Sequence, residues 1–247
     1  MVSRIRIDRL LVERGLFESR AKAQAAIAAG CVTADDVVVG KPSEEIPANA
    51  TLRAEPPHPY VSRGGVKLAA ALDHFRRDTI FDPRGRACLD VGASTGGFTD
   101  VLLARGARSV HAVDVGRGQL HQSLRTRAEI VSIEGTDIRT LDPARLQERP
   151  DFIVVDVSFI SLKLVLPAAF ELAQPKASLL ALIKPQFEAG RRNAKKGIVR
   201  DPLVRAAAYD DIASFVASSG WHVAGIMPSP IPGGDGNVES FIAAHRG

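Results

Sequence analysis

The sequence predicts an α/β protein in which a doubly wound, Rossmann-like parallel sheet follows a small N-terminal α+β unit. From residue 87 onward, short apolar segments rich in β-branched residues alternate with helical patterns, as in parallel sheets covered by helices on both faces. A glycine-containing loop follows the first of these segments and opens a helix. Pro56, Pro57 and Pro59 cannot continue a helix or a central strand, so they predict a spacer between two units.

The composition is that of a folded chain. The 247 residues are 45% hydrophobic and 24% charged, which provides enough apolar side chains for a core. Cys31 and Cys88 are too few for a disulfide framework, so we expect a reducing, cytoplasmic environment. Because no apolar run reaches roughly 18 residues and the N-terminus lacks a signal-peptide pattern, we expect neither a membrane span nor secretion.

The small unit is expected to contain two helices followed by short strands. Apolar residues at helical spacing predict a helix that includes Ile7 to Leu11, and Gly15 ends it. Ser19 is typical of an N-cap and Gly30 of a C-terminal stop, so they bound a second helix. We expect that helix over Arg20–Ala29 and a hairpin formed by Cys31–Thr33, the turn Ala34–Asp36 and Val37–Val39.

The large unit alternates strands with helices. We expect strands over Ala87–Val91, Val110–Val113, Ile130–Ile133, Phe152–Val157, Leu179–Ile183, His222–Met227 and Val238–Ala243. The helical patterns cover Gly97–Arg105, Leu162–Ala173 and Pro202–Ser218. A sheet of this kind binds its ligand in the crevice beyond the carboxyl ends of the strands.

The basic residues of the chain gather in two places. The small unit is neutral overall, with eight basic and eight acidic residues, so the formal net charge of +4 belongs to the large unit. Within the small unit, however, the basic residues concentrate before residue 30, and a second cluster lies in a loop-like stretch from 191 to 200. The residues that we expect to contact nucleic acid are Arg4, Arg6, Arg9, Arg20, Lys22, Arg63, Arg191, Arg192, Lys195 and Lys196.

The glycine-containing loop, residues 90–100, favours an adenosine-bearing ligand that has no phosphate. In a dinucleotide fingerprint starting at Gly92, the second glycine would let the backbone approach a pyrophosphate, but Ser94 occupies that position. No P-loop signature is present either. S-adenosylmethionine fits this description. The loop residues expected to bind it are Gly92, Ser94, Thr95, Gly96, Gly97 and Phe98.

Three carboxylates support a cofactor site at this place. Asp114 ends the second strand, about 20 residues after the loop, where an acid can accept hydrogen bonds from both ribose hydroxyls. Asp137 follows the third strand and is expected near the adenine. Asp90 stands at the loop entry and is expected near the methionine amino group. Each alone is often a turn or capping residue, but their succession at strand ends favours a binding role.

Several motifs are similar to those of one family. They are "IDRLLVERGLFESRAKAQAAIAAGCVT", "YVSRGGVKL", "CLDVGASTGGFTDVLLARGA", "VVDVSFISL", "LIKPQFE" and "PIPGGDGNVESF". The chain resembles the TlyA family, also called haemolysin A-like, in which an S4 RNA-binding domain precedes an FtsJ-like ribose methyltransferase. The S4 hairpin turn is usually close to V-N-G, whereas Ala34–Asp36 stands here. The resemblance implies an S4-like domain over residues 1–55, a linker over 56–62 and a methyltransferase domain over 63–247.

The resemblance also implies a catalytic tetrad of Lys67, Asp156, Lys184 and Glu239. In this hypothesis Lys184 is the general base for a ribose 2′-hydroxyl, Asp156 and Lys67 position it, and Glu239 holds the acceptor ribose. Partial desolvation and a second ammonium nearby favour the neutral amine that a base requires. The expected reaction is methylation of cytidine in ribosomal RNA by S-adenosylmethionine, with ribosomal subunits as partners.

Other functions are less consistent with the sequence. An enzyme that methylates exocyclic amines usually carries [ND]-P-P-[YF], where this chain has Asp156–Phe159, and no cysteine lies near the place that a C5-pyrimidine enzyme requires. A non-catalytic RNA-binding or ribosome-assembly protein, and a membrane-active haemolysin, remain as alternatives. We predict no metal ligands and no membrane partner, and the sequence leaves the oligomeric state and the modified nucleotide open.

Overall fold

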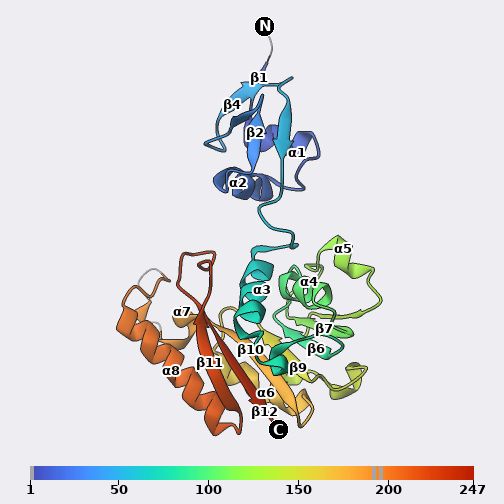
Figure 1. The fold of residues 1–247 in the computed structure, drawn as a ribbon, viewed down its shortest axis with the longest axis vertical. Helices are drawn as coiled ribbons and strands as arrows, with labels where there is room; N and C mark the ends of the chain where they lie inside the picture. The colour runs from blue at the N-terminus through green and yellow to red at the C-terminus, as the bar shows by residue number, and fades with distance from the viewer. Residues whose placement is uncertain (1–2, 191–192, 195–196) are drawn as a thin grey trace. The chain divides into compact units, whose positions relative to one another are not determined.

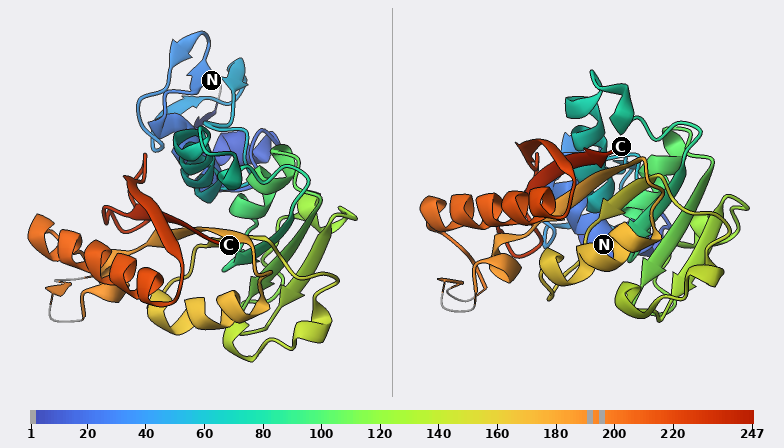
Figure 2. Two further views of the ribbon diagram at one scale, coloured as in Figure 1. Left: turned by 60° about the horizontal axis from the view of Figure 1, so that its bottom comes forward. Right: turned by 90° about the horizontal axis from the view of Figure 1, so that it is seen from below.

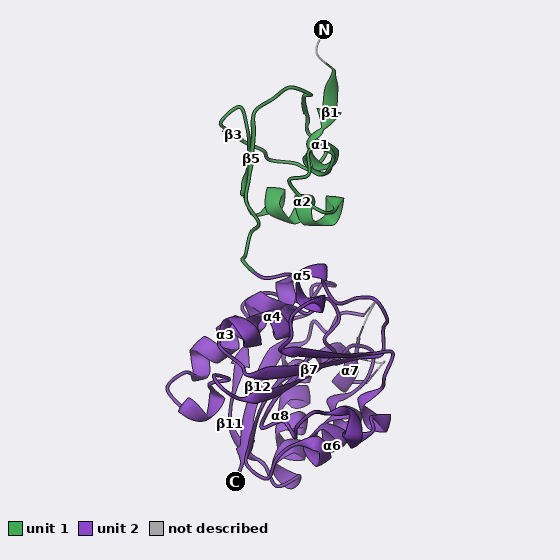
Figure 3. Cartoon of the chain, turned by 90° about the vertical axis from the view of Figure 1, so that its right-hand side faces the viewer, with its two compact units in different colours: residues 1–59 green, residues 60–247 purple. Residues whose placement is uncertain are grey.

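The chain divides after Pro59 into two units in the computed structural model, residues 1–59 and 60–247 (Figure 3). The structure describes residues 3–190, 193–194 and 197–247. The basic residues Arg191, Arg192, Lys195 and Lys196, which we expected to contact RNA, therefore lie outside the described residues.

Unit 1 packs two short helices against short antiparallel strands. Its elements are β1 (Arg4–Arg6), α1 (Ile7–Glu13), α2 (Arg20–Ala28), β2 (Val32–Ala34), β3 (Val37–Val38), β4 (Glu45–Pro47) and β5 (Leu52–Ala54). Strand β1 pairs with β4, and the second sheet has the order β3-β2-β5. Ile7 and Leu11 of α1, Ala23 and Ile27 of α2, and Val32 of β2 are buried in one core.

The hairpin turn of unit 1 consists of Asp35 and Asp36. Both residues have positive φ, 48° and 64°, and Ala34 pairs with Val37 across the turn. A two-residue connection with both residues at positive φ is what a type I′ turn requires, and aspartate tolerates that region better than most residues. The Asp35 side chain also accepts a hydrogen bond from the Thr51 N–H, at 2.8 Å. The turn thus forms without the glycine of the usual S4 pattern.

Unit 2 is built on one seven-stranded sheet (Figure 1). Its strands are β6 (Ala87–Val91), β7 (Ser109–Asp114), β8 (Ile130–Glu134), β9 (Phe152–Val155), β10 (Ala177–Ile183), β11 (His222–Pro228) and β12 (Ser240–Arg246), in the order β11-β12-β10-β9-β6-β7-β8. The pairs among β6 to β10 are parallel, whereas β12 runs antiparallel to both β10 and β11.

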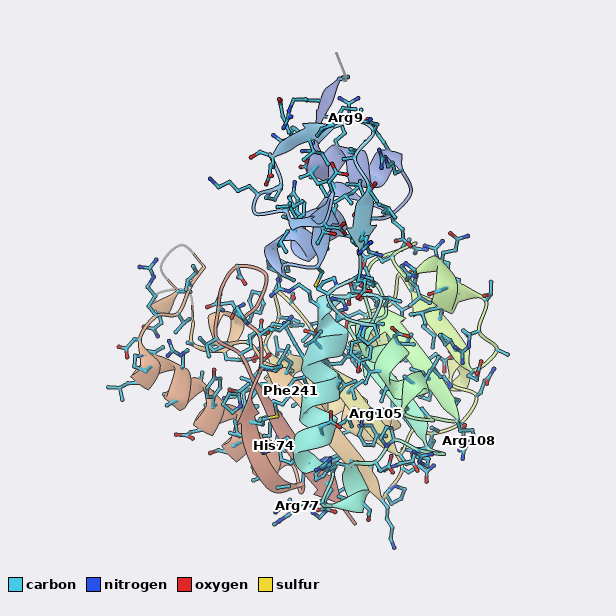
Figure 4. All side chains as sticks on the ribbon, turned by 45° about the horizontal axis from the view of Figure 1, so that its top comes forward. Arg9, His74, Arg77, Arg105, Arg108 and Phe241 are labelled. Atoms are coloured by element: carbon cyan, nitrogen blue, oxygen red, sulfur yellow. The ribbon has the colours of Figure 1, made fainter. Side chains whose placement is uncertain are left out.

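Helices cover both faces of this sheet (Figure 2). They are α3 (Arg63–Phe75), α4 (Gly97–Ala104), α5 (Gln122–Arg125), α6 (Leu162–Leu172), α7 (Pro185–Glu188) and α8 (Pro202–Ser218), with 3-10 turns at Thr79–Phe81, Ile138–Thr140 and Pro143–Arg145. Because successive strand residues point to opposite faces, Val154 packs with α3 and α4 while Ile153 packs with α6 and α8. Phe241 of β12 lies on the α3 side, stacked on Phe98 at 5.9 Å between ring centroids (Figure 4).

The predicted α/β fold is confirmed, with two corrections. The last strand is antiparallel, because residues 229–239 join β11 to β12 by a loop and not by the crossover helix that a parallel connection needs. Several strand boundaries also differ by a few residues, and two of them lie beside predicted site residues: β9 ends at Val155 and not at Val157, and β12 begins at Ser240 and not at Val238. Asp156 and Glu239 therefore lie immediately outside strands, next to their ends.

Candidate active site

The loop after β6 requires glycine at two positions. Gly92 has φ +86°, and a Cβ there would lie 2.5 Å from the carbonyl oxygen of Asp156. Gly96, the N-cap of α4, has φ +91°, and a Cβ there would lie 2.4 Å from the side chain of Leu124. A larger residue at either position would push the loop away from its neighbours. Gly92 allows the loop to pack directly against the segment that follows β9, and Gly96 allows it to pack against Leu124 of α5.

A first cavity of about 350 Å³ opens beside this loop at the carboxyl ends of the strands. Of the predicted cofactor residues, Gly92, Ser94, Asp114 and Asp137 line it. The Asp114 carboxylate is fixed by the N–H groups of Ser94 and Gly116, each at 2.7 Å. Within the described part of the chain, no lysine or arginine lines this cavity. Carboxylates without basic side chains in the lining suit a nucleoside that carries a positive charge.

Asp90 and Asp137 behave differently from each other. Asp137 lines the first cavity, and Arg139 holds its carboxylate at 2.5 Å, which lowers the pKa of Asp137. Asp90 is fully buried and lines none of the cavities described here. Its Oδ2 accepts a hydrogen bond from the Thr99 hydroxyl at 2.7 Å, and burial raises its pKa to about 7. Asp90 thus lies beneath the loop, and its place near the methionine amino group stays a prediction.

The four residues of the predicted tetrad form two buried ion pairs. Nζ of Lys184 lies 2.6 Å from Oδ1 of Asp156, and Nζ of Lys67 lies 2.6 Å from Oε2 of Glu239. Lys184 also donates a hydrogen bond to the Ser158 hydroxyl, at 2.9 Å. The hydrogen-bond partner of Lys67 is Glu239, and the role of Lys67 in positioning Lys184 stays a prediction. Both lysines are nine-tenths buried or more, so their partners are needed to hold charge there.

Sheet topology brings these residues to one edge. Asp156 and Lys184 follow the carboxyl ends of the parallel strands β9 and β10, and Glu239 precedes the amino end of β12. Because β12 is antiparallel to β10, its amino end lies at the same edge as the carboxyl end of β10. Lys67 comes from α3, which packs on the face next to this edge.

Two further cavities meet at the tetrad. One of about 280 Å³ is lined by Arg63, Lys67, Asp156 and Lys184 together with Thr95, Gly97 and Phe98 of the loop. The other, of about 690 Å³, is lined by Lys67, Lys184, Glu239, Phe159, Phe187, Asp235 and Gly197, among others. We call the larger one the acceptor cavity. Ser158 lines all three cavities, so they adjoin one another at this residue.

An aromatic pair stands at the wall of the acceptor cavity. Phe159 is 91% exposed and has φ +65°, an unusual conformation for a residue with a bulky side chain. Its ring centroid lies 5.2 Å from that of Phe187. Exposed rings of this kind offer a face on which a nucleobase can stack.

Glu188 ties the loop after β9 to the segment that follows β10. Its carboxylate accepts hydrogen bonds from the Ser161 hydroxyl at 2.5 Å and from the Leu162 N–H at 2.9 Å. Burial raises the pKa of Glu188. The loop that carries Asp156 is thereby fixed relative to the strand that ends in Lys184. Sequence reasoning missed Glu188 and Ser158, although both lie in motifs that it had quoted.

Of the basic residues expected to contact RNA, those that the structure describes are held by acceptors of their own unit. In unit 1, Arg6 and Arg20 pair with the fully buried Asp8, at 3.1 and 2.8 Å. The other pairings in unit 1 join Arg4 to the Glu45 carbonyl, Arg9 to Glu13 at 2.6 Å and Lys22 to Glu18 at 2.6 Å. In unit 2, Arg63 donates to the Pro232 carbonyl at 2.8 Å. The side chains of Arg6, Arg9, Arg20 and Lys22 nevertheless stay between 41% and 69% exposed.

Family models match both units. The model of the FtsJ-like methyltransferase matches residues 60–246, and that of the S4 domain matches residues 5–52. The chain belongs to the FtsJ-like methyltransferase family. The 16S/23S rRNA (cytidine-2′-O)-methyltransferase TlyA of Mycobacterium tuberculosis is 44% identical over 98% of this chain and 90% of its own. Hemolysin A of Brachyspira hyodysenteriae is 38% identical over 95% of this chain and 97% of its own. The predicted resemblance to the TlyA family is confirmed.

Solved structures agree with the fold. A candidate hemolysin of Streptococcus thermophilus is 38% identical and superimposes with a TM-score of 0.77, covering all of this chain and 90% of its own. The N-methyltransferase NodS of Bradyrhizobium japonicum, at 15% identity and a TM-score of 0.51 over 72% of this chain, shares the fold of unit 2 alone. Among the helices that the structure describes, none combines the length and the apolar character of a membrane span.

Proposed function

We propose that this chain methylates the ribose 2′-hydroxyl of a cytidine in ribosomal RNA, with S-adenosylmethionine as the methyl donor. The observation that carries the proposal is the pair of buried ion pairs, Lys184 with Asp156 and Lys67 with Glu239, at the junction of the three cavities. A binding protein without catalysis has no need for two desolvated lysines at one point of its crevice. The names of the rRNA methyltransferase relatives support the same reaction.

The residues of the first cavity fit S-adenosylmethionine. Asp114, whose carboxylate two N–H groups hold in place, suits the ribose hydroxyls, and Asp137 would lie toward the adenine end, where Val115 and Ile138 offer apolar surface. The absence of lysine and arginine from the described lining residues suits a ligand with a sulfonium. When bound, the cofactor supplies an electrophilic methyl group. Asp90 would support this site from below, through Thr99.

Lys184 is the general base in this proposal. Lys184 must first release the proton of its ammonium to solvent. The neutral amine, which Asp156 and Ser158 hold in position, then takes up the hydroxyl proton as the ribose oxygen bonds to the methyl carbon and the bond between that carbon and the donor sulfur breaks, its electron pair staying on the sulfur. Glu239 would accept a hydrogen bond from the acceptor ribose, while Lys67 fixes its carboxylate. Positioning of the hydroxyl relative to the methyl group supplies much of the remaining acceleration.

The S4-like unit and Arg63 are proposed to bind the RNA backbone. Phosphates attract basic residues irrespective of sequence, and double-stranded RNA is read largely by shape and by its 2′-hydroxyl groups. The exposed portions of Arg6, Arg9, Arg20 and Lys22 provide such contacts without losing their internal partners. We also propose that the S4-like domain covers residues 1–55 and the methyltransferase domain residues 63–247, with a linker between them.

The direct test is methyl transfer from labelled S-adenosylmethionine to separated 30S and 50S subunits, followed by mapping of the modified nucleotide. We expect label on a ribose oxygen of a cytidine. No incorporation into either subunit would contradict the proposed activity, and label on a base would contradict the assigned chemistry.

Replacement of Lys184 tests the role of the base. We expect Lys184→Ala and Lys184→Arg each to lower kcat about 10² to 10⁴-fold, because neither side chain accepts a proton at neutral pH. Affinity for S-adenosylmethionine, measured by calorimetry, should be unchanged. Lys163→Ala is the matched control, since Lys163 forms a surface pair with Asp211 on α6 and α8, at 2.6 Å. Activity retained by Lys184→Arg would show that only positive charge is required.

A further inference from the structure

Asn237 occupies an unusual position for an amide side chain. It is 1% exposed and lies in the loop between β11 and β12, two residues before Glu239. Because a buried amide group is costly unless its hydrogen bonds are made, its partners determine what it can do.

Every polar atom of the Asn237 side chain has a partner. Oδ1 accepts a hydrogen bond from the Val199 N–H at 2.9 Å, and Nδ2 donates to the Gly197 carbonyl at 2.8 Å and to Asp235 Oδ2 at 3.1 Å. The two bonds to Gly197 and Val199 join segments about 40 residues apart in the sequence. Asn237 therefore joins residues 197–199, which precede α8, to the loop that ends in Glu239.

The main chain of Asn237 continues this contact toward Glu239. Its carbonyl accepts a hydrogen bond from the Gly233 N–H at 2.9 Å. Gly233 in turn lies so close to Glu239 that a Cβ there would be 2.5 Å from Oε1. The Glu239 carboxylate thus rests between this backbone and the ammonium of Lys67.

The groups that Asn237 joins form one wall of the acceptor cavity. Gly197, Gly234, Asp235 and Glu239 all line that cavity, and none of them lines the first cavity, which we assign to the cofactor. A substitution at Asn237 should therefore change how the acceptor is bound without changing how the cofactor is bound.

We infer that Asn237 is a positioning residue for the RNA acceptor, which closes the wall of the acceptor cavity and sets the place of Glu239. This inference rests on the proposed function. An asparagine is suited to the task because its side chain accepts one N–H and donates two hydrogen bonds, which neither aspartate nor leucine can do. A small displacement of a group that orients a substrate can lower the rate about a hundredfold.

The test compares Asn237→Ala, Asn237→Asp, Asp235→Asn and the double variant Asp235→Asn/Asn237→Asp in the full-length protein. Asn237→Asp turns the donor into a carboxylate facing the Gly197 carbonyl and the Asp235 carboxylate. In the double variant, the amide introduced at position 235 restores a donor opposite the carboxylate introduced at position 237. Asp235→Asn alone completes this cycle of variants. Lys163→Ala, which removes only the surface pair with Asp211 between α6 and α8, is the control.

We expect Asn237→Ala and Asn237→Asp to lower kcat/KM for ribosomal subunits at least about tenfold, with unchanged affinity for S-adenosylmethionine. The double variant should have a higher kcat/KM than Asn237→Asp, and Lys163→Ala should stay near the wild type. All assays are run well below the melting temperature of each variant. Because Asn237→Ala introduces no buried charge, it remains informative if Asn237→Asp does not fold.

Two outcomes would overturn the inference. One is wild-type kcat/KM in Asn237→Ala, and the other is an equal loss of cofactor affinity, which would indicate general loss of structure. An inactive wild-type protein would instead contradict the proposed function, so the two failures are distinguishable.

Discussion

Asp90 links protonation to folding at the level of a single residue. Burial raises its pKa from an ordinary value near 4 to about 7, so the folded protein holds this proton more firmly than the unfolded chain does. The stability that Asp90 contributes is therefore fully present below about pH 4 and is lost as the pH rises toward 7. An amide at this position stays neutral throughout and can still accept the Thr99 hydrogen bond.

We predict that the free energy of unfolding of the wild type, relative to that of Asp90→Asn, falls by up to about 4 kcal/mol between pH 4 and pH 7. Urea unfolding of both proteins, without cofactor and at several pH values, measures this difference, and the titration of all other groups cancels in it. A difference that does not change with pH would mean that Asp90 is ionised throughout.

The residues of the tetrad could be predicted from the sequence, but their pairing could not. Family motifs mark Lys67 and Glu239, and apolar strands that end in Asp156 and Lys184 mark the other two. Which carboxylate each lysine meets depends on side-chain positions that no local pattern encodes, since Lys67 and Glu239 are 172 residues apart. Ser158 gave no signal, because a hydroxyl in a loop is usually only a turn residue.

At the level of the helix, α1 depends on one buried charge. Asp8 accepts hydrogen bonds from Arg6, Arg20 and Gln24 and has no exposed surface. The Arg6 guanidinium, with Arg20 and Gln24, holds the pKa of Asp8 well below its usual range despite the opposing effect of burial. The stability that Asp8 contributes is therefore present above about pH 4 and is lost as the pH falls.

We predict that Asp8→Asn lowers the stability of unit 1 by about 1 to 3 kcal/mol at neutral pH, because a charge-assisted network loses its acceptor. Hydrogen exchange of the α1 and α2 amides measures this effect separately from unit 2. Glu13→Gln, on the same helix, removes only the exposed pair with Arg9 and should change stability by less than about 1 kcal/mol. Equal effects of the two variants would contradict the role given to Asp8.

The observed helices and strands agree best with those predicted from the sequence where the hydrophobic pattern extends over many residues. The pattern from 202 to 218 predicts α8, and Asp201 caps it as the Pro202 at its first position suggests. The pairing of β1 with β4 was not foreseen, because each has three residues and their contact spans about 40 positions. The direction of β12 could not be predicted from local sequence patterns either. The sequence of loop 229–239 does not show whether the strand that follows it runs antiparallel or parallel to β11.

For the whole molecule, the proposed division of labour predicts two different responses to salt. Binding of ribosomal RNA should weaken steeply as salt rises, because each phosphate contact releases counterions. Affinity for S-adenosylmethionine should change little, since no basic residue among those described lines its cavity. Filter binding and calorimetry over the same salt series measure the two. Equal salt dependence of both would contradict separate sites.

A single arginine refines this prediction. Arg9 lies on α1 of unit 1, and its side chain is 69% exposed. Arg77 lies in unit 2, just after α3 (Figure 4). If Arg9 meets a phosphate, Arg9→Gln should reduce the slope of log Kobs against log salt by about 0.7 to 0.9. Arg77→Gln is the control and should leave the slope unchanged.

The ion pair between Lys67 and Glu239 joins two positions that lie 172 residues apart in the sequence. During translation the amino end emerges first, so Glu239 and β12, which lies between β10 and β11 in the sheet, are made long after Lys67. Until then the acceptor cavity lacks one wall and Lys67 lacks its carboxylate. Under the proposed function, a nascent chain that has not yet reached β12 has no complete acceptor site, so it cannot methylate the ribosome that is making it.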